Sequence, residues 1–329
     1  MSKTILITGG AGYIGSHTAK ALSLSGYHIV VLDNLSKGHR EAVKWCDLYE
    51  GDIADLQVLE KIANDHDICS IVHFAAFSDV GESMTHPELY MTNNYEKTKV
   101  MIDYFLTQQL ESVIFSSTCA TYGLPETLPL TESNPQNPIN PYGESKLRVE
   151  QYLKEKELSH GLKSVILRYF NAAGCDLDGE IGEWHDPETH LIPKVMRNIL
   201  DNNHSISIYG DDYPTPDGSC IRDYIHVADL AQAHVEALAY LKALNPSVAL
   251  NLGSGNGFSV FEIVASIERI AGVTINRVLV PRREGDPPKL ISSNTLILSI
   301  LNWTPKHSNI DKIIESQWNW ISKRYVEIK

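Results

Sequence analysis

The sequence has a deficit of positive charge, few cysteines and no long apolar run. Its 329 residues include 28 Lys and Arg against 41 Asp and Glu, a formal net charge of −13. A chain this acidic argues against generic nucleic-acid binding and against anionic membranes, although a single phosphate ligand can still sit in a local basic pocket. Apolar runs such as residues 29–32 fall far short of the roughly 20 residues that span a bilayer. We therefore expect neither a nucleic-acid partner nor a membrane partner.

The cysteines also argue against a disulfide-stapled, secreted protein. They are odd in number, widely scattered and without a C-x-x-C pair: Cys46, Cys69, Cys119, Cys175 and Cys220. Such a pattern is typical of reduced thiols in the cytoplasm. Residues 1–3 run straight into the apolar stretch 4–7, without the apolar core and cleavage site of a signal peptide. We expect a cytoplasmic protein.

The first half of the chain alternates strand and helix patterns. Nearly continuous apolar runs, typical of parallel strands covered on both faces, occupy residues 4–8, 28–32, 69–74, 112–117 and 164–169. Helical patterns lie between them at residues 13–25, 54–64, 89–110 and 141–157. Strands and helices that alternate in this way predict an α/β fold with a Rossmann-type doubly wound parallel sheet.

The second half differs in composition. Residues 174–190 and 210–220 are rich in Gly, Pro, Asp and His, and residues 277–290 in Arg, Pro and Gly. We expect helices at 191–202, 226–244, 259–271 and 310–325, and one strand at 248–252. The sequence therefore predicts a first domain over residues 1–172 and a smaller α/β domain over 173–329, with segments able to return to the first. The second domain would cover the C-terminal edge of the sheet, where open α/β sheets bind ligands.

A glycine-rich turn follows the first predicted strand at once. Thr8-Gly9-Gly10-Ala11-Gly12-Tyr13-Ile14-Gly15 contains G-x-G-x-x-G and opens the first predicted helix. Without side chains the backbone can turn sharply and approach a diphosphate, which the helix N-terminus stabilises. Asp33, about 20 residues further on, is placed to accept both ribose hydroxyls of a dinucleotide. Its charge disfavours a 2′-phosphate, so we expect NAD, while the nearby Lys37 and Arg40 leave NADP open.

Asp52-Ile53 ends a third short strand. A carboxylate there can reach the adenine amino group of the dinucleotide. It can equally cap the helix predicted at 54–64, and the two roles do not exclude each other.

Tyr142 and Lys146 form a candidate acid/base pair. Asn140-Pro141 predicts a helix start, with Asn140 as the cap, which places Tyr142 and Lys146 at i and i+4 on one face. A phenol with a pKa near 10 must be lowered by about 3 units, or about 4 kcal/mol, to act as a base at neutral pH. One positive charge about 4 Å away at an effective dielectric constant of about 20 supplies that order of energy. Together with Thr118 upstream, the pair predicts proton transfer next to a dinucleotide.

Further motifs keep order and spacing over almost the whole chain. They are residues 8–17, 32–35, 73–76, 80–83, 93–94, 116–118, 122–123, 141–146, 168–171, 212–215, 217–218, 222–227, 251–253 and 282–286. On these motifs the chain resembles the extended short-chain dehydrogenases/reductases and, within them, the UDP-glucose 4-epimerases. The later motifs, Arg222-Asp223-Tyr224-Ile225-His226-Val227 and Arg282-Arg283-Glu284-Gly285-Asp286, are the most specific, because Rossmann reductases in general lack them.

The resemblance implies an NAD-dependent isomerase with no net redox change. Tyr142 would take the proton of the sugar 4-hydroxyl, directly or through Thr118, and NAD would accept the C4 hydride. The 4-keto sugar would then turn over and receive the hydride on its other face. Such a reaction needs strong contacts to UDP and few to the hexose, with the arginines pairing with the phosphates. The alternatives are a structural ion pair for Arg222 and Asp223, and a solvated loop for Arg282, Arg283 and Glu284.

The resemblance also implies site residues. Those expected at the cofactor are Gly9, Gly12, Tyr13, Ile14, Gly15, Asp33, Asn34, Asp52, Ile53, Phe74, Ala75, Ala76, Asn93, Ser116, Tyr142, Lys146 and Tyr169. Those expected at the UDP-sugar are Thr118, Asn171, His190, Leu191, Tyr209, Arg222, Arg283, Asp286 and Leu290. The helices near 89–110 and 141–157 are expected to form a homodimer.

Some positions depart from the family pattern. Cys119-Ala120 stands where 4,6-dehydratases have an Asp-Glu pair, which disfavours dehydration. Ser78, Lys97 and His190 replace the Lys, Gly and Asn that many relatives carry. Leu290 stands where some members have Tyr and others a smaller residue, and a smaller side chain is associated with N-acetylated sugars, so interconversion of UDP-GlcNAc and UDP-GalNAc stays open. UDP-pentoses as substrates and a nucleotide-sugar oxidoreductase on the same scaffold are further alternatives.

We expect no metal site. Residues 183–190 hold two His and several carboxylates, but their spacing matches no helical H-E-x-x-H motif and they are predicted to lie in a loop.

Overall fold

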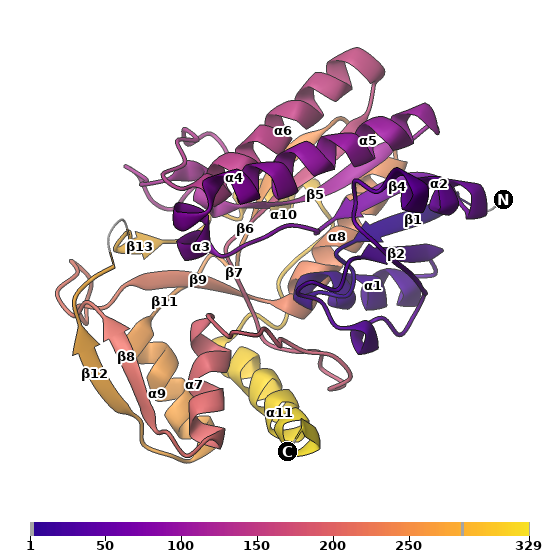
Figure 1. The fold of residues 1–329 in the computed structure, drawn as a ribbon. Coiled ribbons are helices and arrows are strands. Elements are labelled where there is room, and N and C mark those ends of the chain that lie inside the picture. The colour runs from indigo at the N-terminus through magenta and orange to yellow at the C-terminus, as the bar shows by residue number, and fades with distance from the viewer. Residues whose placement is uncertain (1–2, 284–285, 329) are drawn as a thin grey trace.

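Seven parallel strands form the central sheet in the order β10-β6-β5-β4-β1-β2-β3. The structure is a computed structural model and describes residues 3–283 and 286–328. Figure 1 shows the sheet with helices on both sides. Its strands are β1 (Lys3–Thr8), β2 (Ile29–Asp33), β3 (Asp47–Glu50), β4 (Asp67–His73), β5 (Ser112–Thr118), β6 (Lys163–Tyr169) and β10 (Val248–Leu252). This confirms the Rossmann-type fold predicted from the alternating pattern.

Two hydrophobic cores lie on opposite faces of this sheet. On one face α1 (Tyr13–Leu24), α8 (Val227–Lys242) and α10 (Thr295–Ile300) pack, and their buried side chains include Leu22, Leu230 and Ile297. On the other face lie α2 (Leu56–Asp65), α5 (Lys97–Thr107) and α6 (Pro141–His160). The central strands bury every residue over most of their length because both faces are covered, which explains their continuous apolar runs.

Two elements of the second half of the sequence belong to this central layer. Strand β10 pairs in parallel with β6, and α8 packs against α1. The chain therefore returns to the first sheet after residue 226. We keep the division near residue 172 as a proposal, with α8, β10 and α10 as the returning segments.

The helix predicted over residues 89–110 is a series of shorter pieces. It begins earlier, with α4 (Pro87–Tyr90), continues as the π-helical η2 (Met91–Glu96) and ends as α5. Short π-helical segments are frequent at functional sites, because the wider turn redirects a side chain. Here the side chain at the π-helical turn is Asn94, which is buried.

The smaller part of the structure packs three helices against short strands, and Figure 1 shows it below and to the left of the main sheet. The helices are α7 (Leu191–Leu200), α9 (Val260–Ala271) and α11 (Ile310–Ile328). Strand β9 (Ile221–His226) pairs with β7 (Asn171–Ala173), β11 (Gly257–Ser259) and β13 (Lys289–Leu290), and β8 (Ser205–Tyr209) pairs with β12 (Asn276–Val280). The remaining elements are α3 (Val80–Thr85), η1 (Arg40–Ala42) and η3 (Cys119–Tyr122). Sequence patterns missed these strands, because none buries a continuous apolar run.

No helix in the described part of the chain combines the length and the apolarity that a membrane span requires.

Candidate functional site

Most predicted site residues of the first half lie at or just after the C-terminal ends of strands β1 to β6. The strand order reverses between β1 and β4, and ligands of open α/β sheets bind at such a point. The glycine loop joins β1 to α1 here. Gly9 has φ +72°, and a Cβ at Gly9 would lie 2.6 Å from the Ala75 nitrogen, so only glycine fits. A Cβ at Gly15 would lie 2.1 Å from the Gly9 oxygen, which makes the turn equally dependent on glycine.

The space above Gly12 is open. A Cβ at this position would meet only the Gly9 carbonyl oxygen, at 3.3 Å. Gly12 is the cap of α1 and has no side chain that could accept from the first N–H groups of that helix. The loop therefore presents backbone N–H groups and a positive helix end to open space, which fits a dinucleotide diphosphate.

Asp33 is tied to the glycine loop. Its carboxylate accepts hydrogen bonds from the N–H of Ala11 at 2.9 Å and of Leu35 at 2.8 Å. Burial raises the pKa of Asp33, and these two hydrogen bonds oppose the rise. Asp33 thus couples the loop to the end of β2, and a carboxylate has lone pairs left for ribose hydroxyls. Asn34 is exposed, and its side-chain oxygen accepts from the N–H of Ser36.

Asp52 does not cap α2. The cap is Asp55, whose side chain accepts from the N–H of Gln57. Asp52 instead accepts from the Ala54 N–H at 2.9 Å and pairs with Lys97 at 2.5 Å. The prediction that Asp52 caps this helix is therefore wrong, because the cap lies three residues further along the chain. The ion pair of Asp52 with Lys97 was not predicted. The neighbouring Ile53 is a buried core residue.

The Tyr13 side chain connects the two halves of the chain. Its hydroxyl donates to the Gly174 carbonyl oxygen at 2.5 Å, and burial raises its pKa well above the ordinary value. What Tyr13 offers to a cofactor is thus its backbone at the start of α1. Its neighbour Ile14 packs against the core on the α1 side of the sheet.

The segment after β4 lies beside the glycine loop. The N–H groups of Phe74 and Ala75 both donate to the Thr8 carbonyl oxygen. Ala76, the last of the three residues expected at the cofactor here, is partly buried. These hydrogen bonds hold the two backbones together at the C-terminal ends of β1 and β4.

Asn94 holds this segment in place, a role that sequence reasoning missed. Its side chain accepts from the N–H of Phe77 at 2.8 Å and donates to the Phe77 carbonyl at 2.9 Å. It also donates to Ser145 Oγ on α6 at 3.1 Å. The predicted cofactor residue Asn93 donates to Asn94 in turn. The Asn93-Asn94 motif was the sequence feature that could have indicated this role. Which of the two side chains holds the segment depends on the π-helical turn, which the sequence pattern did not predict.

His73 is a second residue that the sequence did not single out. Its ring bridges Thr8 Oγ1 at 2.6 Å and Thr98 Oγ1 at 2.8 Å. Because Thr98 donates to the Asn94 carbonyl oxygen, it accepts from His73 Nε2, and Nδ1 accepts from Thr8. Burial, and to a lesser degree the charge of Lys146, lower the pKa of His73 to about 3. His73 is thus a neutral structural link between β1, β4 and α5.

Tyr142 and Thr118 meet where α6 approaches the end of β5. Helix α6 begins at Pro141, and Asn140 caps it by accepting from the Gly143 N–H at 2.8 Å, as predicted. A Cβ at Gly143 would lie 2.6 Å from the Ala120 oxygen, so this glycine permits the close approach. Burial raises the pKa of Tyr142 to about 12, and a side-chain hydrogen bond from Thr118 lowers it.

Lys146 does not lower the pKa of Tyr142 in the protein alone, contrary to our expectation. Its ammonium donates to the Ser116 carbonyl oxygen at 2.7 Å and lies 4.9 Å from the Phe115 ring centre. Burial lowers the pKa of Lys146 to about 7, although Glu150 raises it. The helical spacing is right, but burial outweighs the attraction between charges that the spacing suggested.

Tyr169 and Ser116 complete this edge of the sheet. Tyr169 lies opposite Thr118 in the β5–β6 pairing and forms a side-chain hydrogen bond with Ser116. Its hydroxyl also donates a hydrogen bond to His234 Nε2. Nε2 is the accepting nitrogen because Nδ1 of the same ring donates to the Leu230 carbonyl oxygen.

The arginines expected at the diphosphate lie on the second half of the chain. Arg222 pairs with Asp286, so two expected substrate residues contact each other. The alternative pair of Arg222 with Asp223 is not formed, because Asp223 is fully buried and accepts from the backbone and hydroxyls of Ser254 and Ser292. Leu290 on β13 lies opposite Arg222 in the strand pairing.

Two more expected contacts stack on each other. The Arg283 guanidinium lies 4.0 Å from the centre of the Tyr209 ring. Its neighbour Arg282 bonds Asp212 and stacks on Tyr213 at 4.3 Å, so it is not simply solvated. Glu284 and Gly285 lie outside the described residues.

Three more residues expected at the UDP-sugar lie at the start of α7 and at β7. His190 caps α7, and Leu191 is the first helical residue. The His190 ring lies 2.5 Å from Glu183 Oε1; burial lowers its pKa, but Glu183 and Glu188 outweigh this and raise it to about 9. Asn171 begins β7 opposite Tyr224.

A buried ion pair joins helix α6 to strand β6. Arg168 donates to both carboxylate oxygens of Glu150, at 3.1 and 2.7 Å, and to the Tyr122 hydroxyl at 2.8 Å. The Ser117 hydroxyl donates to the same carboxylate. This network fastens α6 to β5 and β6 one turn after Lys146. Ser117, Tyr122 and Arg168 belong to motifs found in the sequence, but the motifs did not indicate their contacts or Glu150.

The family comparisons agree with this geometry. The model of the NAD dependent epimerase/dehydratase family matches residues 5–253. The chain is 49% identical to a UDP-glucose 4-epimerase of Rhizobium meliloti over 323 residues, 98% of each chain. It is 48% identical to a UDP-glucose 4-epimerase of Lacticaseibacillus casei over 318 residues, 96% of each chain.

Solved structures show the same likeness in three dimensions. A UDP-glucose 4-epimerase from Brucella ovis in complex with NAD superposes with a TM-score of 0.94 at 48% identity, over 97% of this chain and 98% of that one. One from Stenotrophomonas maltophila with NAD and formylated UDP-arabinopyranose gives a TM-score of 0.95 at 33% identity, over 99% of both. The UDP-Glc/GlcNAc 4-epimerase from Campylobacter jejuni gives 0.85 at 41% identity, over 98% of this chain and all of that one (100%).

Proposed function

Because the chain belongs to the NAD dependent epimerase/dehydratase family, we propose that it interconverts UDP-glucose and UDP-galactose by inverting C4 of the hexose with NAD as cofactor. It is an isomerase in this proposal. The single observation that supports it most is the hydrogen bond between Thr118 and Tyr142 at the sheet edge that also holds the glycine loop. In this proposal Tyr142 would accept a proton beside the dinucleotide site.

The residues that would hold NAD lie mostly at or just after the C-terminal ends of strands β1 to β6, with others on η2 and α6. Gly9, Gly12 and Gly15 would shape the diphosphate turn, and Asp33, which accepts from the Ala11 N–H of this turn, would contact the adenosine ribose. Asp52, held by Lys97, would contact the adenine. When bound, NAD supplies a reversible hydride acceptor at its nicotinamide ring.

Tyr142 would move the proton of the sugar 4-hydroxyl. Thr118 donates a hydrogen bond to its oxygen and so favours the phenolate over the phenol. Lys146 anchors the other side of the site through the Ser116 carbonyl. Because the pKa of Tyr142 in the protein alone is about 12, the remaining stabilisation has to come from positive charge in the assembled complex.

The substrate would be held by its UDP. Arg222 and Arg283 would pair with the two phosphates, and Asp286 would contact the sugar or ribose hydroxyls. Arg222 now pairs with Asp286 and Arg283 stacks on Tyr209, so both guanidinium groups are already ordered near the site. Asn171, His190 and Leu191 would meet the uridine. Few contacts to the hexose leave a 4-keto sugar free to turn over.

The test is an assay without added cofactor. Purified protein is incubated separately with UDP-galactose, UDP-N-acetylgalactosamine and UDP-arabinopyranose, and the products are identified by chromatography. We expect UDP-glucose from UDP-galactose with no accumulation of NADH at 340 nm. Stoichiometric NADH would instead show an oxidoreductase, and no conversion of any sugar would overturn the proposal.

N-acetylated substrates are the second candidate, for one structural reason. Leu290 lies in a small cluster with Tyr122, Leu130, Phe170 and Cys119, and in this proposal the cluster would border the sugar. A relative of this chain, from Campylobacter jejuni, is named for both UDP-Glc and UDP-GlcNAc. The second arm of the assay decides between the two substrate classes.

We further propose a cytoplasmic homodimer. The described cysteines are all free thiols, which suits a reducing compartment. Apolar side chains are exposed on α3, α4 and α5: Val80, Met84, Leu89 and Val100 are 44%, 61%, 44% and 40% exposed. Figure 1 shows α5 and α6 together on one side of the sheet. Light scattering after gel filtration should give twice the mass of 36.7 kDa.

A further inference from the structure

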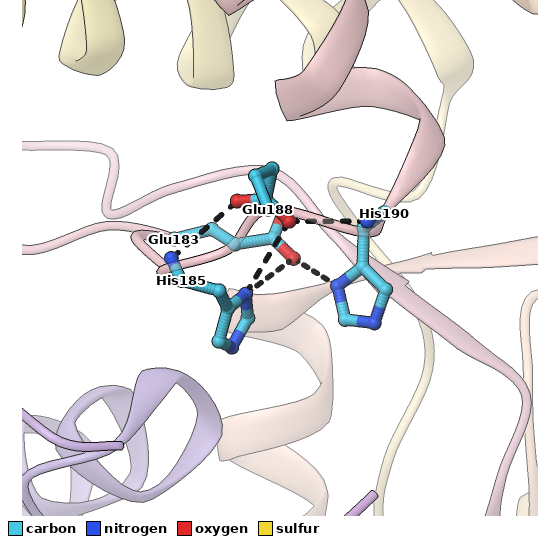
Figure 2. Close-up of side chains that lie close together, drawn as sticks. All are labelled: Glu183, His185, Glu188 and His190. Carbon is cyan, nitrogen blue, oxygen red and sulfur yellow. Dashed lines mark hydrogen bonds and ion pairs between the residues drawn. The ribbon is translucent and has the colours of Figure 1, made fainter. Parts of the chain in front are cut away.

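Two glutamates and two histidines converge in the loop before α7. Glu183, His185, Glu188 and His190 each offer one ligand atom, and these atoms lie within 4.8 Å of one another. Figure 2 shows both rings and both carboxylates pointing to one place. Glu-x-His occurs twice here, five residues apart, and the loop folds the two copies together. The spacing in sequence argued against a metal because it matched no helical motif; the fold removes that objection.

The carboxylates of this cluster are buried. The side chain of Glu183 is 1% exposed and that of Glu188 is 4% exposed. Two carboxylates out of contact with water require cations or several hydrogen bonds. His190 donates to Glu183, and Glu188 Oε1 accepts from the N–H groups of Thr189 and His190.

His185 is the member of the cluster whose ring nitrogen lacks a hydrogen bond among the described residues. Its Nδ1 atom is buried and has no hydrogen-bond partner within residues 3–283 and 286–328. The same atom lies 3.6 Å from Glu183 Oε1 and 3.6 Å from Glu188 Oε1. It therefore aims at both carboxylates and is too far away to bond either one.

We propose that Glu183, His185, Glu188 and His190 bind one divalent transition-metal ion of the Zn²⁺ type. Imidazole nitrogens and carboxylate oxygens are its ordinary ligands, at about 2.0–2.2 Å. The edge of a tetrahedron of that size is about 3.3–3.6 Å, which the two contacts of His185 match. Metal entry replaces the proton between His190 and Glu183 and lengthens that 2.5 Å contact by about 1 Å.

A second cluster in the same loop shows what a filled site looks like. The carboxylates of Asp176, Asp178 and Glu180 also converge, but Lys20 Nζ lies among them at 2.8, 2.9 and 2.7 Å. Within the described residues no lysine pairs with the Glu183–His190 cluster. The nearest guanidinium, that of Arg197, faces the other oxygen of Glu188 at 3.4 Å. The acidic cluster around Lys20 is therefore a natural control.

The bound ion is structural, because four protein ligands leave no open position for a reactant. It would fix the loop where it touches the first half of the chain. The His185 ring lies edge-on to Tyr13 at 6.2 Å, and His39 bonds the Trp184 carbonyl oxygen at 2.9 Å. It would also orient His190, a consequence that rests on the proposed uridine contact; metal binding itself does not.

The experiment uses the purified full chain. Metal content is measured by mass spectrometry, and the protein is then stripped with a chelator and titrated calorimetrically with ZnCl₂, MnCl₂ and CaCl₂. We expect one Zn²⁺ per chain, with Ca²⁺ much weaker because it prefers an all-oxygen shell. His185→Gln should weaken Zn²⁺ binding at least about tenfold. The change suits the fold because the side chain is 28% exposed. Asp178→Asn, in the cluster around Lys20, should bind as the wild type does.

Several outcomes would overturn the proposal. They are no saturable Zn²⁺ binding by the wild type, unchanged binding by His185→Gln, or loss of binding in Asp178→Asn. Co²⁺ loaded in place of Zn²⁺ gives a second readout, since a tetrahedral site has intense visible absorption and a surface-bound ion does not. All readouts are independent of sugar turnover, so their failure leaves the proposed epimerase reaction standing.

Discussion

Replacing Thr118 by valine should shift the pH dependence of catalysis. In the structure Thr118 donates a hydrogen bond to Tyr142, and this bond lowers the pKa that burial raises to about 12. Valine keeps the shape and removes the donor. The phenolate then loses one charge-assisted hydrogen bond, worth about 1.5–3 kcal/mol.

The magnitude follows from that bond. At about 1.36 kcal/mol per pKa unit, the pKa of Tyr142 in the enzyme complex should rise by about 1–2 units. The base must be deprotonated to act, so the rate rises with pH through this pKa. Without the bond the rising limb moves to higher pH. At neutral pH kcat should fall about 10- to 100-fold, and part of it should return at pH 9.

The assay is kcat for UDP-galactose turnover between pH 6 and 9.5. Thr118→Ser is the matched control, because it keeps the hydroxyl that donates to Tyr142 and accepts from the Ala120 N–H at 3.1 Å. We expect its profile to stay near that of the wild type. A valine variant whose rate falls equally at every pH would refute the reasoning, since Thr118 would then act on binding and not on the acidity of Tyr142.

Two further predictions concern stability. Arg168→Met should lower the free energy of unfolding by about 3–5 kcal/mol in urea, because it leaves the Glu150 carboxylate buried without its cation. The control Arg148→Met breaks an exposed pair with Glu144 and should cost less than about 1 kcal/mol; equal losses would contradict the argument. Acid should also destabilise the protein, because burial lowers the pKa of four histidines to about 4 or about 3, and the unfolded chain binds their protons first. These are His17, His73, His226 and His234. Between pH 6.5 and 5 each can contribute up to about 2 kcal/mol of loss, and a urea midpoint that stays constant over this range would count against buried neutral histidines.

Local features of the site follow from neighbouring residues. The glycine turn can be recognised because a positive φ and a close backbone approach exclude other residues at Gly9. The start of α6 follows in the same way from Asn140 as a cap and Pro141 at the first helical position. The apolar runs of the central strands predict burial on both faces. These features depend on a few residues in a row, so pattern alone suffices for them.

Contacts between segments far apart in the sequence cannot be predicted from local patterns. Strand β10 joins the first sheet from beyond residue 247, and Arg222 pairs with Asp286 instead of its neighbour Asp223. The short strands β8 and β12 form in parallel because each supplies the other's hydrogen bonds, although neither has a strong pattern.

The pKa values and charge contacts of the site were the features least predictable from the sequence. The i, i+4 spacing of Tyr142 and Lys146 suggested a lowered pKa for the tyrosine, yet burial raises it, because removing a charge from water outweighs a cation that bonds elsewhere. Likewise, two Glu-x-His pairs converge only because the loop bends back on itself. Local backbone conformation depends on a few neighbouring residues, so the sequence alone can predict it. Burial and charge contacts are sums over the whole packed molecule, so they exist only once it has folded.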